Sequence, residues 1–334
     1  MISGVDFPMA ALHEMHPSTI EEALPALETD VFRGYLGDDP ERIRAIMPTD
    51  TPVDPTCFTD AMGVKVSLDY CPWIWDRTGV VETRIPIPTD TYLGEAIEYV
   101  GFAVAVERAT GRDTLTVVEL GAGWGPWVSL GSVNAHRLGF PNARIVAFEA
   151  DGDRYNALRQ HLALNNIVPA DAPAEGEGNG YQWKLHHAAA HWEDSVLYWP
   201  AESNVLDAGM AAITDPDATN DYRGQPIATI EVKAVSVTRA LSHLDIIDFM
   251  HIDIQGGEED LLPRIIDDLE TKVRVLFLGT HSRKIEGDFI QMLGDRGWHL
   301  FRERPCQFYP MSEAPTLVGR TYMDGAQLWI NPRL

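Results

Sequence analysis

The chain has 334 residues, 45% of them hydrophobic, which suits one large α/β domain with appendages or about two domains. Its formal net charge of −24 would repel phosphate backbones and anionic membrane surfaces, so the charge disfavours a nucleic-acid substrate. No stretch approaches the roughly 18 consecutive apolar residues of a membrane span, and we expect none.

The cysteines and the N-terminus indicate the compartment. Cys57, Cys71 and Cys306 are too few and too scattered for a disulfide framework or a zinc knuckle. The first residues lack the basic and then apolar profile of a signal peptide. We therefore expect a cytoplasmic protein with reduced cysteines.

Residues 1–90 differ in pattern from the rest of the chain. Frequent prolines leave room only for short helices, which we expect at 18–27 and 39–46. This part predicts an N-terminal accessory layer or lid and not a second full domain. The main domain is expected to span 91–334.

The main domain alternates between apolar residues at helical spacing and short apolar or β-branched runs. We expect helices at 91–110, 127–138, 153–164, 258–269 and 285–293. Strands are expected at 115–120, 144–149, 181–189, 195–199, 227–237, 246–254, 273–278, 298–302 and 327–331. Residues 169–180 and 200–226 are rich in Pro, Ala, Gly and acidic residues and predict loops.

This alternation favours a mostly parallel sheet with helices on both faces. The continuous apolar run 273–278 is typical of a strand buried on both sides. No long helix separates the last two strands, so one antiparallel strand should lie at or inside an edge.

The stretch after the first main strand predicts a ligand site. It reads Gly121-Ala122-Gly123-Trp124-Gly125 and then Pro126, which suits a tight turn followed by the first turn of a helix. Dinucleotide sites carry G-x-G-x-x-G, and Pro126 stands where their third glycine would fall. Glu119 would be unfavourable near a pyrophosphate but favourable near a cationic sulfonium.

The second main strand ends at Glu149, which is placed to accept hydrogen bonds from ribose hydroxyls. S-adenosylmethionine therefore fits this turn better than NAD does. The residues expected to bind it are Glu119, Gly121, Ala122, Gly123, Trp124, Gly125, Glu149, Ala150 and Asp253.

Three segments carry a resemblance to a known family. Residues 119–125 resemble motif I of class I S-adenosylmethionine-dependent methyltransferases. Residues 147–151, Ala-Phe-Glu-Ala-Asp, resemble the A-F-E-P segment of the FkbM family, with Ala150 in place of proline. Residues 248–258 are similar to that family's K-x-D-[VI]-E-G-x-E signature, with His251 in place of lysine and Gln255 in place of glutamate.

The resemblance implies a Rossmann-like class I methyltransferase fold, with a mostly parallel seven-stranded sheet and a late antiparallel strand. It also implies methylation of hydroxyl groups on sugars, polyketides or similar metabolites.

The catalytic candidates follow from the expected sheet, because ligands of open α/β sheets bind beyond the carboxyl ends of the strands. Asp253 and His281 end successive strands and should converge with Glu119 and Glu149. A hydroxyl nucleophile benefits from a base, for which histidine is suited near neutral pH. Our hypothesis is that His281 or His251 is this base and that Asp253 orients the histidine or the hydroxyl. A buried core histidine is the alternative interpretation of His251.

A metal is the less favoured alternative. His251, Asp253, Glu258 and His281 include ligand types for a divalent cation, but their spacing matches no metal motif. The run Glu258-Glu259-Asp260 is also what the first turn of a helix prefers, because of the helix dipole.

The sequence thus predicts an S-adenosylmethionine-dependent O-methyltransferase acting on a small-molecule or carbohydrate acceptor. Two alternatives stay open, an NAD-dependent oxidoreductase and a non-catalytic methyltransferase-like binding protein. Acceptor specificity is expected to come from 1–90 and from the two loops, and neither the acceptor nor the oligomeric state follows from the sequence.

Overall fold

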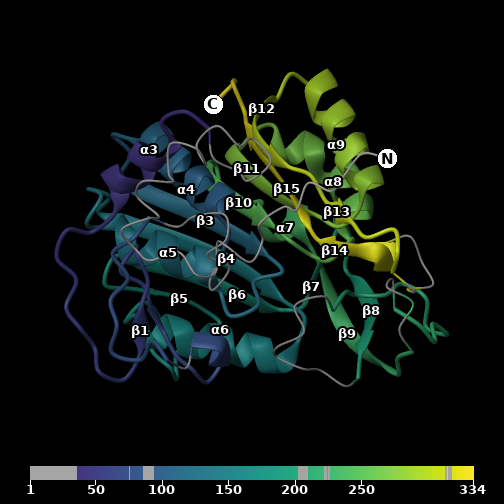
Figure 1. Cartoon of the computed structure of the whole chain (residues 1–334), viewed down its shortest axis with the longest axis horizontal. Coiled ribbons are helices and arrows are strands. Elements are labelled where there is room, and N and C mark those ends of the chain that lie inside the picture. Colours follow the sequence, from purple (N-terminus) through teal and green to yellow (C-terminus); the bar gives the residue numbers. More distant parts are fainter. Residues whose placement is uncertain are drawn as a thin grey trace, which may run out of the picture.

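The computed structural model describes residues 36–74, 76–85, 94–201, 210–221, 224, 226–312, 314 and 318–334. An eight-stranded sheet forms the centre of the molecule (Figure 1). Its strands, in spatial order, are β12 (His299–Arg304), β15 (Gly325–Ile330), β11 (Val273–Thr280), β10 (Ile247–Ile252), β3 (Thr114–Leu120), β4 (Asn142–Glu149), β6 (Tyr181–His187) and β5 (Glu175–Gly178).

The strand directions confirm the predicted α/β fold. Neighbouring strands from β11 to β6 are parallel. The late strand β15 is antiparallel to both of its neighbours, β11 and β12, so it lies inside the edge of the sheet. The fold is therefore α/β and Rossmann-like, with a mixed, mostly parallel sheet.

The expected number of seven strands and the expected loop at 169–180 are both wrong, because β5 pairs antiparallel with β6 at the far edge. Its sequence, Glu-Gly-Glu-Gly, has no strand preference of its own. A side chain at Gly176 would overlap the indole ring of Trp183, which comes within 2.6 Å of a Cβ built there. The glycine therefore lets Trp183 pack over the added strand.

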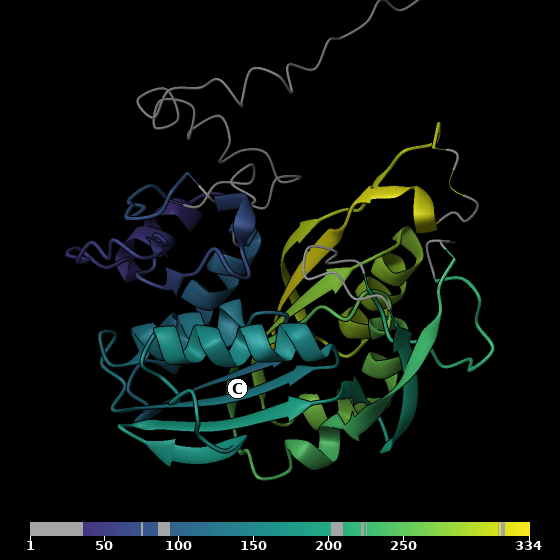
Figure 2. The same cartoon turned by 90° about the horizontal axis from the view of Figure 1, so that it is seen from below.

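Helices cover both faces of the sheet (Figures 1 and 2). One face packs against α4 (Ala96–Ala109), α5 (Pro126–Ala135) and α6 (Gly152–Leu164), and the other against α7 (Val237–Ala240), α8 (Glu258–Leu269) and α9 (Arg283–Asp295). Side chains alternate along each strand, so Val117 enters the first core and Val118 the second. The helices predicted from the sequence are thus confirmed within a few residues, with 91–93 outside the described part.

The N-terminal part supplies α3 (Asp39–Ile46), β1 (Phe58–Thr59), β2 (Lys65–Val66) and the 3₁₀ turn η2 (Pro72–Ile74). The helix predicted at 39–46 is confirmed, whereas 18–27 lies outside the described residues. Ile43 and Ile46 join the core on the α4 side, and Asp39 pairs with Arg302 at 2.6 Å. The segment lies over the same face as α4 to α6 (Figure 2).

Two small sheets flank the carboxyl ends of the main strands. One contains β7 (Ala189–His191), β9 (Thr229–Ser236) and β8 (Ser195–Pro200). The other pairs β13 (Gln307–Phe308) with β14 (Thr321–Met323), and the turn η3 (Val318–Arg320) directly precedes β14. The strand expected at 181–189 therefore divides, because the chain leaves the main sheet after His187 and enters the first small sheet. No helix in the described part of the chain is both long and apolar enough to cross a membrane.

Candidate functional site

The glycine loop lies between the end of β3 and the start of α5. All three glycines have positive φ, at 78° for Gly121, 56° for Gly123 and 76° for Gly125. A Cβ at Gly121 would overlap the carbonyl oxygen of Asp253, and a Cβ at Gly125 would overlap Leu158. A Cβ at Gly123 would meet nothing within 4 Å. Two of the glycines therefore permit close packing, and the third faces open space.

That open space is a cavity of about 700 Å³ at the carboxyl ends of β3, β4, β10 and β11. Its lining includes all the residues predicted to bind the cofactor except Gly125, which packs against Leu158. The predicted catalytic residues His251, Asp253 and His281 also line it. The volume is in the range of sites for small molecules and cofactors.

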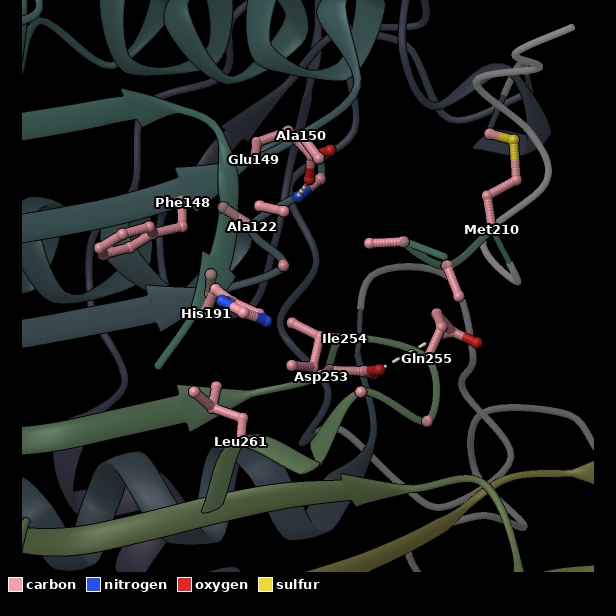
Figure 3. Close-up of a pocket in the computed structure, with 18 of the residues that line it drawn as sticks. Ala122, Phe148, Glu149, Ala150, His191, Met210, Asp253, Ile254, Gln255 and Leu261 are labelled. Carbon is pink, nitrogen blue, oxygen red and sulfur yellow. Dashed lines mark hydrogen bonds between the residues drawn. The ribbon is translucent and has the colours of Figure 1, made fainter. Parts of the chain in front are cut away.

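Glu149 ends β4 and lies beside Ala122 of the glycine loop (Figure 3). Its Oε2 accepts a hydrogen bond from the Gly123 amide at 2.7 Å, and its Oε1 accepts one from the Asp151 amide at 2.8 Å. Burial raises the pKa of this carboxyl to about 7, although both amides act in the opposite direction. Each oxygen keeps a second lone pair, so the ionised group can still accept from a ligand hydroxyl.

Glu119 lines the cavity and also contacts the start of α5. Its Oε2 accepts a hydrogen bond from the Val128 amide at 2.9 Å, in the first turn of α5. Burial raises the pKa of Glu119 well above its usual value, and the amides of Val128 and Trp127 only partly oppose this. The side chain fixes the start of the helix, and its expected contact with a sulfonium stays a prediction.

The loop after β10 turns sharply back on itself. Gln255 has φ 56° and Gly256 has φ 97°, both in the left-handed region. The turn lets the Glu258 carboxylate accept hydrogen bonds from the Ile254 amide at 2.6 Å and the Gly256 amide at 2.8 Å. Glu258 is fully buried, whereas the neighbouring Glu259 is exposed. Glu259 lines the cavity, whereas Glu258, which the sequence named as a possible metal ligand, holds the loop beneath it.

His281 follows β11 and lies among carboxylates. Its Nε2 is 3.3 Å from Asp253 Oδ1 and 3.9 Å from Asp324 Oδ2, and its Nδ1 is 3.4 Å from Glu258 Oε2. Burial lowers the pKa of His281, but Glu258 and Asp253 outweigh it and raise the pKa well above its usual value. The predicted neighbours Asp253 and His281 are thus brought together, and Asp324, just before β15, joins them from a distant part of the sequence.

His251 lies on β10, directly beside Glu119 in the strand pairing. Its Nε2 donates a hydrogen bond to Glu98 Oε1 at 2.8 Å, and its ring stacks on Phe277 with centroids 4.5 Å apart. Its Nδ1 has no hydrogen-bond partner among the described residues. Sequence reasoning missed Glu98, because its position in the first turn of α4 is also where a capping residue stands.

The first small sheet closes the far side of the cavity with residues that the sequence did not single out. Trp199 on β8 donates from Nε1 to Asp151 Oδ2 at 3.2 Å. His191 on β7 and Met210 also line the cavity, and Met210 lies across it from Glu149 and Asp253 (Figure 3). Residues 210–214 of the loop 200–226 line the cavity, although 202–209, 222–223 and 225 lie outside the described residues. None of the described residues of 1–90 or 169–180 lines it, and the expectation that these segments set acceptor specificity stays a prediction.

No family model matches the chain. A protein of Jannaschia sp. (strain CCS1), named "Putative methyltransferase", is 27% identical over 286 residues, which cover 84% of this chain and 94% of that protein. The assignment to the FkbM family therefore stays a resemblance carried by the three motifs.

Several solved structures are also similar. Precorrin-6y C5,15-methyltransferase from Geobacter metallireducens GS-15 is 14% identical, with a TM-score of 0.35 over 72% of this chain and 90% of that chain. The N-terminal domain of human METTL16 in complex with SAH is 16% identical, with a TM-score of 0.35 over 71% and 69% of the two chains. These TM-scores are too low to carry a conclusion about activity.

The strand order, the inserted antiparallel β15 and the glycine loop over a cavity together define the class. The chain has a Rossmann-like fold of the methyltransferase type.

Proposed function

We propose that this protein is an S-adenosylmethionine-dependent methyltransferase that methylates a hydroxyl group of a sugar, glycan or polyketide-like metabolite. The observation that carries the proposal is the wall formed by Gly123 and Glu149, which are joined by a hydrogen bond at one end of the cavity. The name of the Jannaschia relative and the resemblance to the FkbM motifs support the same class of reaction.

The cofactor fits this wall for three reasons. The open position at Gly123 lets a ligand lie against the backbone, and Glu149 can accept hydrogen bonds from ribose hydroxyls. The helix α5 begins with Pro126, so one of the amides that would hold a pyrophosphate in a dinucleotide site is missing. These features favour adenosine attached to a sulfonium over NAD.

The acceptor side of the cavity supplies the base. In methyl transfer the acceptor oxygen forms a bond to the methyl carbon, the carbon–sulfur bond breaks with its electron pair going to sulfur, and the hydroxyl proton leaves to a base. Of the two predicted histidines we assign this role to His251. Its Nε2–H is held by Glu98, so the lone pair on Nδ1 is available to accept a proton.

Asp253 is placed to orient the acceptor. Its side chain is 35% exposed and lines the same cavity as His251. Holding the hydroxyl in line with the carbon–sulfur bond supplies a large part of the rate in such a displacement.

Calorimetric titration with S-adenosylhomocysteine and with NAD⁺ tests the cofactor. We expect binding of the former, and about tenfold weaker binding after Gly123→Ala, because the new methyl group projects into the cavity beside the ligand. Gly139→Ala is the matched control, since Gly139 also has positive φ and open space around it but lies outside the cavity. Affinity for NAD⁺ alone would overturn the proposal.

The acceptor is found by screening hydroxylated metabolites with a labelled methyl donor, followed by mass spectrometry and NMR of the product. We expect the methyl group on oxygen. A product methylated on nitrogen or carbon would contradict the acceptor class and leave the cofactor assignment intact. Any turnover would exclude the non-catalytic alternative.

A further inference from the structure

A cluster of three side chains that could hold a metal ion lies at the wall of the cavity, which two of them, Asp253 and His281, line. Asp253 lies in the loop after β10, Glu258 is the first residue of α8, and His281 follows β11. One ligand atom from each of them lies within 4.8 Å of the other two. The cluster thus joins three elements that are separated in sequence but meet at one edge of the sheet.

The imidazole of His281 has unmet hydrogen-bonding capacity. The side chain is 1% exposed, and neither ring nitrogen has a hydrogen-bond partner among the described residues. Asp253 Oδ1 at 3.3 Å from Nε2 and Glu258 Oε2 at 3.4 Å from Nδ1 form ion pairs with the ring but are not hydrogen-bonded to it. Buried polar atoms are almost always hydrogen-bonded, so such a ring requires an explanation. A bound cation provides one, because it would take the lone pair of one nitrogen.

The two carboxylates have free capacity of the required kind. Each oxygen of Glu258 accepts one backbone amide and keeps a second lone pair. Asp253 is 35% exposed in the cavity, which gives a cation a route in. Gly279 leaves room for the Asp253 side chain, because a Cβ at 279 would come within 2.8 Å of the Asp253 Cγ.

We propose that Asp253, Glu258 and His281 bind one divalent cation of the Mn²⁺ type. Carboxylate oxygens suit Mg²⁺, Ca²⁺ and Mn²⁺, and an imidazole ligand favours a transition metal among these. Ligand atoms at about 2.1 Å from such an ion lie about 3 Å apart when adjacent and about 4.2 Å apart when opposite. The three ligand atoms lie within 4.8 Å of one another, so the side chains would have to close in around the ion, with one ring nitrogen of His281 turned toward it.

This site goes beyond the proposed function, because a cation can bind there without the methyl donor or the acceptor. It also adds to that function, since the ion would lie in the same cavity as His251. Asp324, at 3.9 Å from His281 Nε2, adds a further carboxylate to the negative field at this point.

The test is titration of the EDTA-treated full chain with Mn²⁺, following the loss of the free-ion signal by electron paramagnetic resonance. We expect one tight site per chain, about tenfold weaker in Asp253→Asn and in His281→Gln. Glu259→Gln, which removes a neighbouring exposed carboxylate of the same helix, is the matched control and should change affinity less than about twofold.

Electron spin-echo modulation identifies the ligand directly. We expect nitrogen modulation from the imidazole in the wild type and in Glu259→Gln, and none in His281→Gln. Bound Mn²⁺ without nitrogen modulation would overturn the site, as would equal weakening by Glu259→Gln and Asp253→Asn. If His281→Gln fails to fold, Asp253→Asn still decides the result, because Asp253 is only partly buried. None of these outcomes depends on binding of S-adenosylhomocysteine.

Discussion

The two ends of the cavity are built in different ways. At the cofactor end the contacts come from backbone amides and glycines within one stretch, residues 119–151. At the acceptor end side chains pair with side chains from distant elements, as Glu98 of α4 does with His251 of β10. The first end depends on the backbone path around the carboxylates of Glu119 and Glu149, and the second on pairs of side chains from different elements. Substitutions should therefore affect cofactor affinity at one end and turnover at the other.

The largest effect is expected for His251→Ala. Loss of the base should lower kcat by about 10²–10⁴. Affinity for S-adenosylhomocysteine should stay within about threefold, because His251 belongs to the acceptor end. Steady-state kinetics with the acceptor found by screening, together with calorimetry, measures both quantities.

Glu98→Gln sharpens the same prediction, since Glu98 is a positioning residue that acts through the ring of His251. It should lower kcat by about tenfold or more with little change in the acceptor KM. A variant that raised KM and left kcat unchanged would show that the pair serves acceptor binding alone. Unchanged turnover in His251→Ala would make His251 a structural residue packed between Phe277 and Trp127.

The next largest effect is expected on stability, at Gly121, where the two ends of the cavity meet. A methyl group there would overlap the carbonyl oxygen of Asp253 and would also occupy a left-handed backbone conformation. Gly121→Ala should lower the free energy of unfolding by about 3 kcal/mol, as the sum of overpacking and backbone strain. Urea denaturation measures this change.

Gly111→Ala is its control, because Gly111 has a φ of 86° and nothing within 4 Å of a Cβ. Backbone strain alone should cost it about 1–2 kcal/mol. Equal destabilisation of the two variants would show that the contact between Gly121 and Asp253 contributes nothing.

The same contrast explains which parts of the site could be predicted from the sequence. The cofactor end could be predicted because a strand, alternating glycines and Pro126 are local signals with fixed geometry. Asp253 and His281 could be placed because the carboxyl ends of parallel strands share one edge of the sheet. The sheet itself could be predicted because segments with helical periodicity of apolar residues alternate clearly with segments typical of strands.

The parts that were missed depend on tertiary contacts. Glu98 was missed because it stands at a helix start, where acidic residues are common for capping. Glu258 was named as a possible metal ligand, but its hydrogen bonds to its own loop were not predicted, because acidic residues are also common there for the helix dipole. Only packing shows that Glu98 holds a histidine and that Glu258 folds back on its own loop. Likewise, β5 is a strand because it pairs with β6 and because Trp183 packs against Gly176. Neither contact can be predicted from the strand propensity of the residues in β5.

The smallest effect concerns pH and Glu149. Its folded pKa of about 7 lies above the ordinary value of 4.5, because burial outweighs the amides of Asp151 and Gly123 and the charge of Arg154. The unfolded chain therefore loses this proton at a lower pH than the folded protein does. As a result, the free energy of unfolding falls as pH rises from 4.5 through about 7. Ligand binding should show the opposite slope, since only the ionised carboxylate offers both oxygens to the ribose hydroxyls.

Between pH 6 and pH 8 the ionised fraction of a group with a pKa of about 7 rises about tenfold. Calorimetry should therefore find S-adenosylhomocysteine bound about tenfold more tightly at pH 8. In Glu149→Gln this pH dependence should vanish, because the amide keeps the shape of the side chain without the titration. If wild type and variant changed equally with pH, another group would be responsible, and the ribose would have to bind elsewhere in the cavity. The cofactor end would then resemble the acceptor end in relying on side chains that the sequence does not reveal.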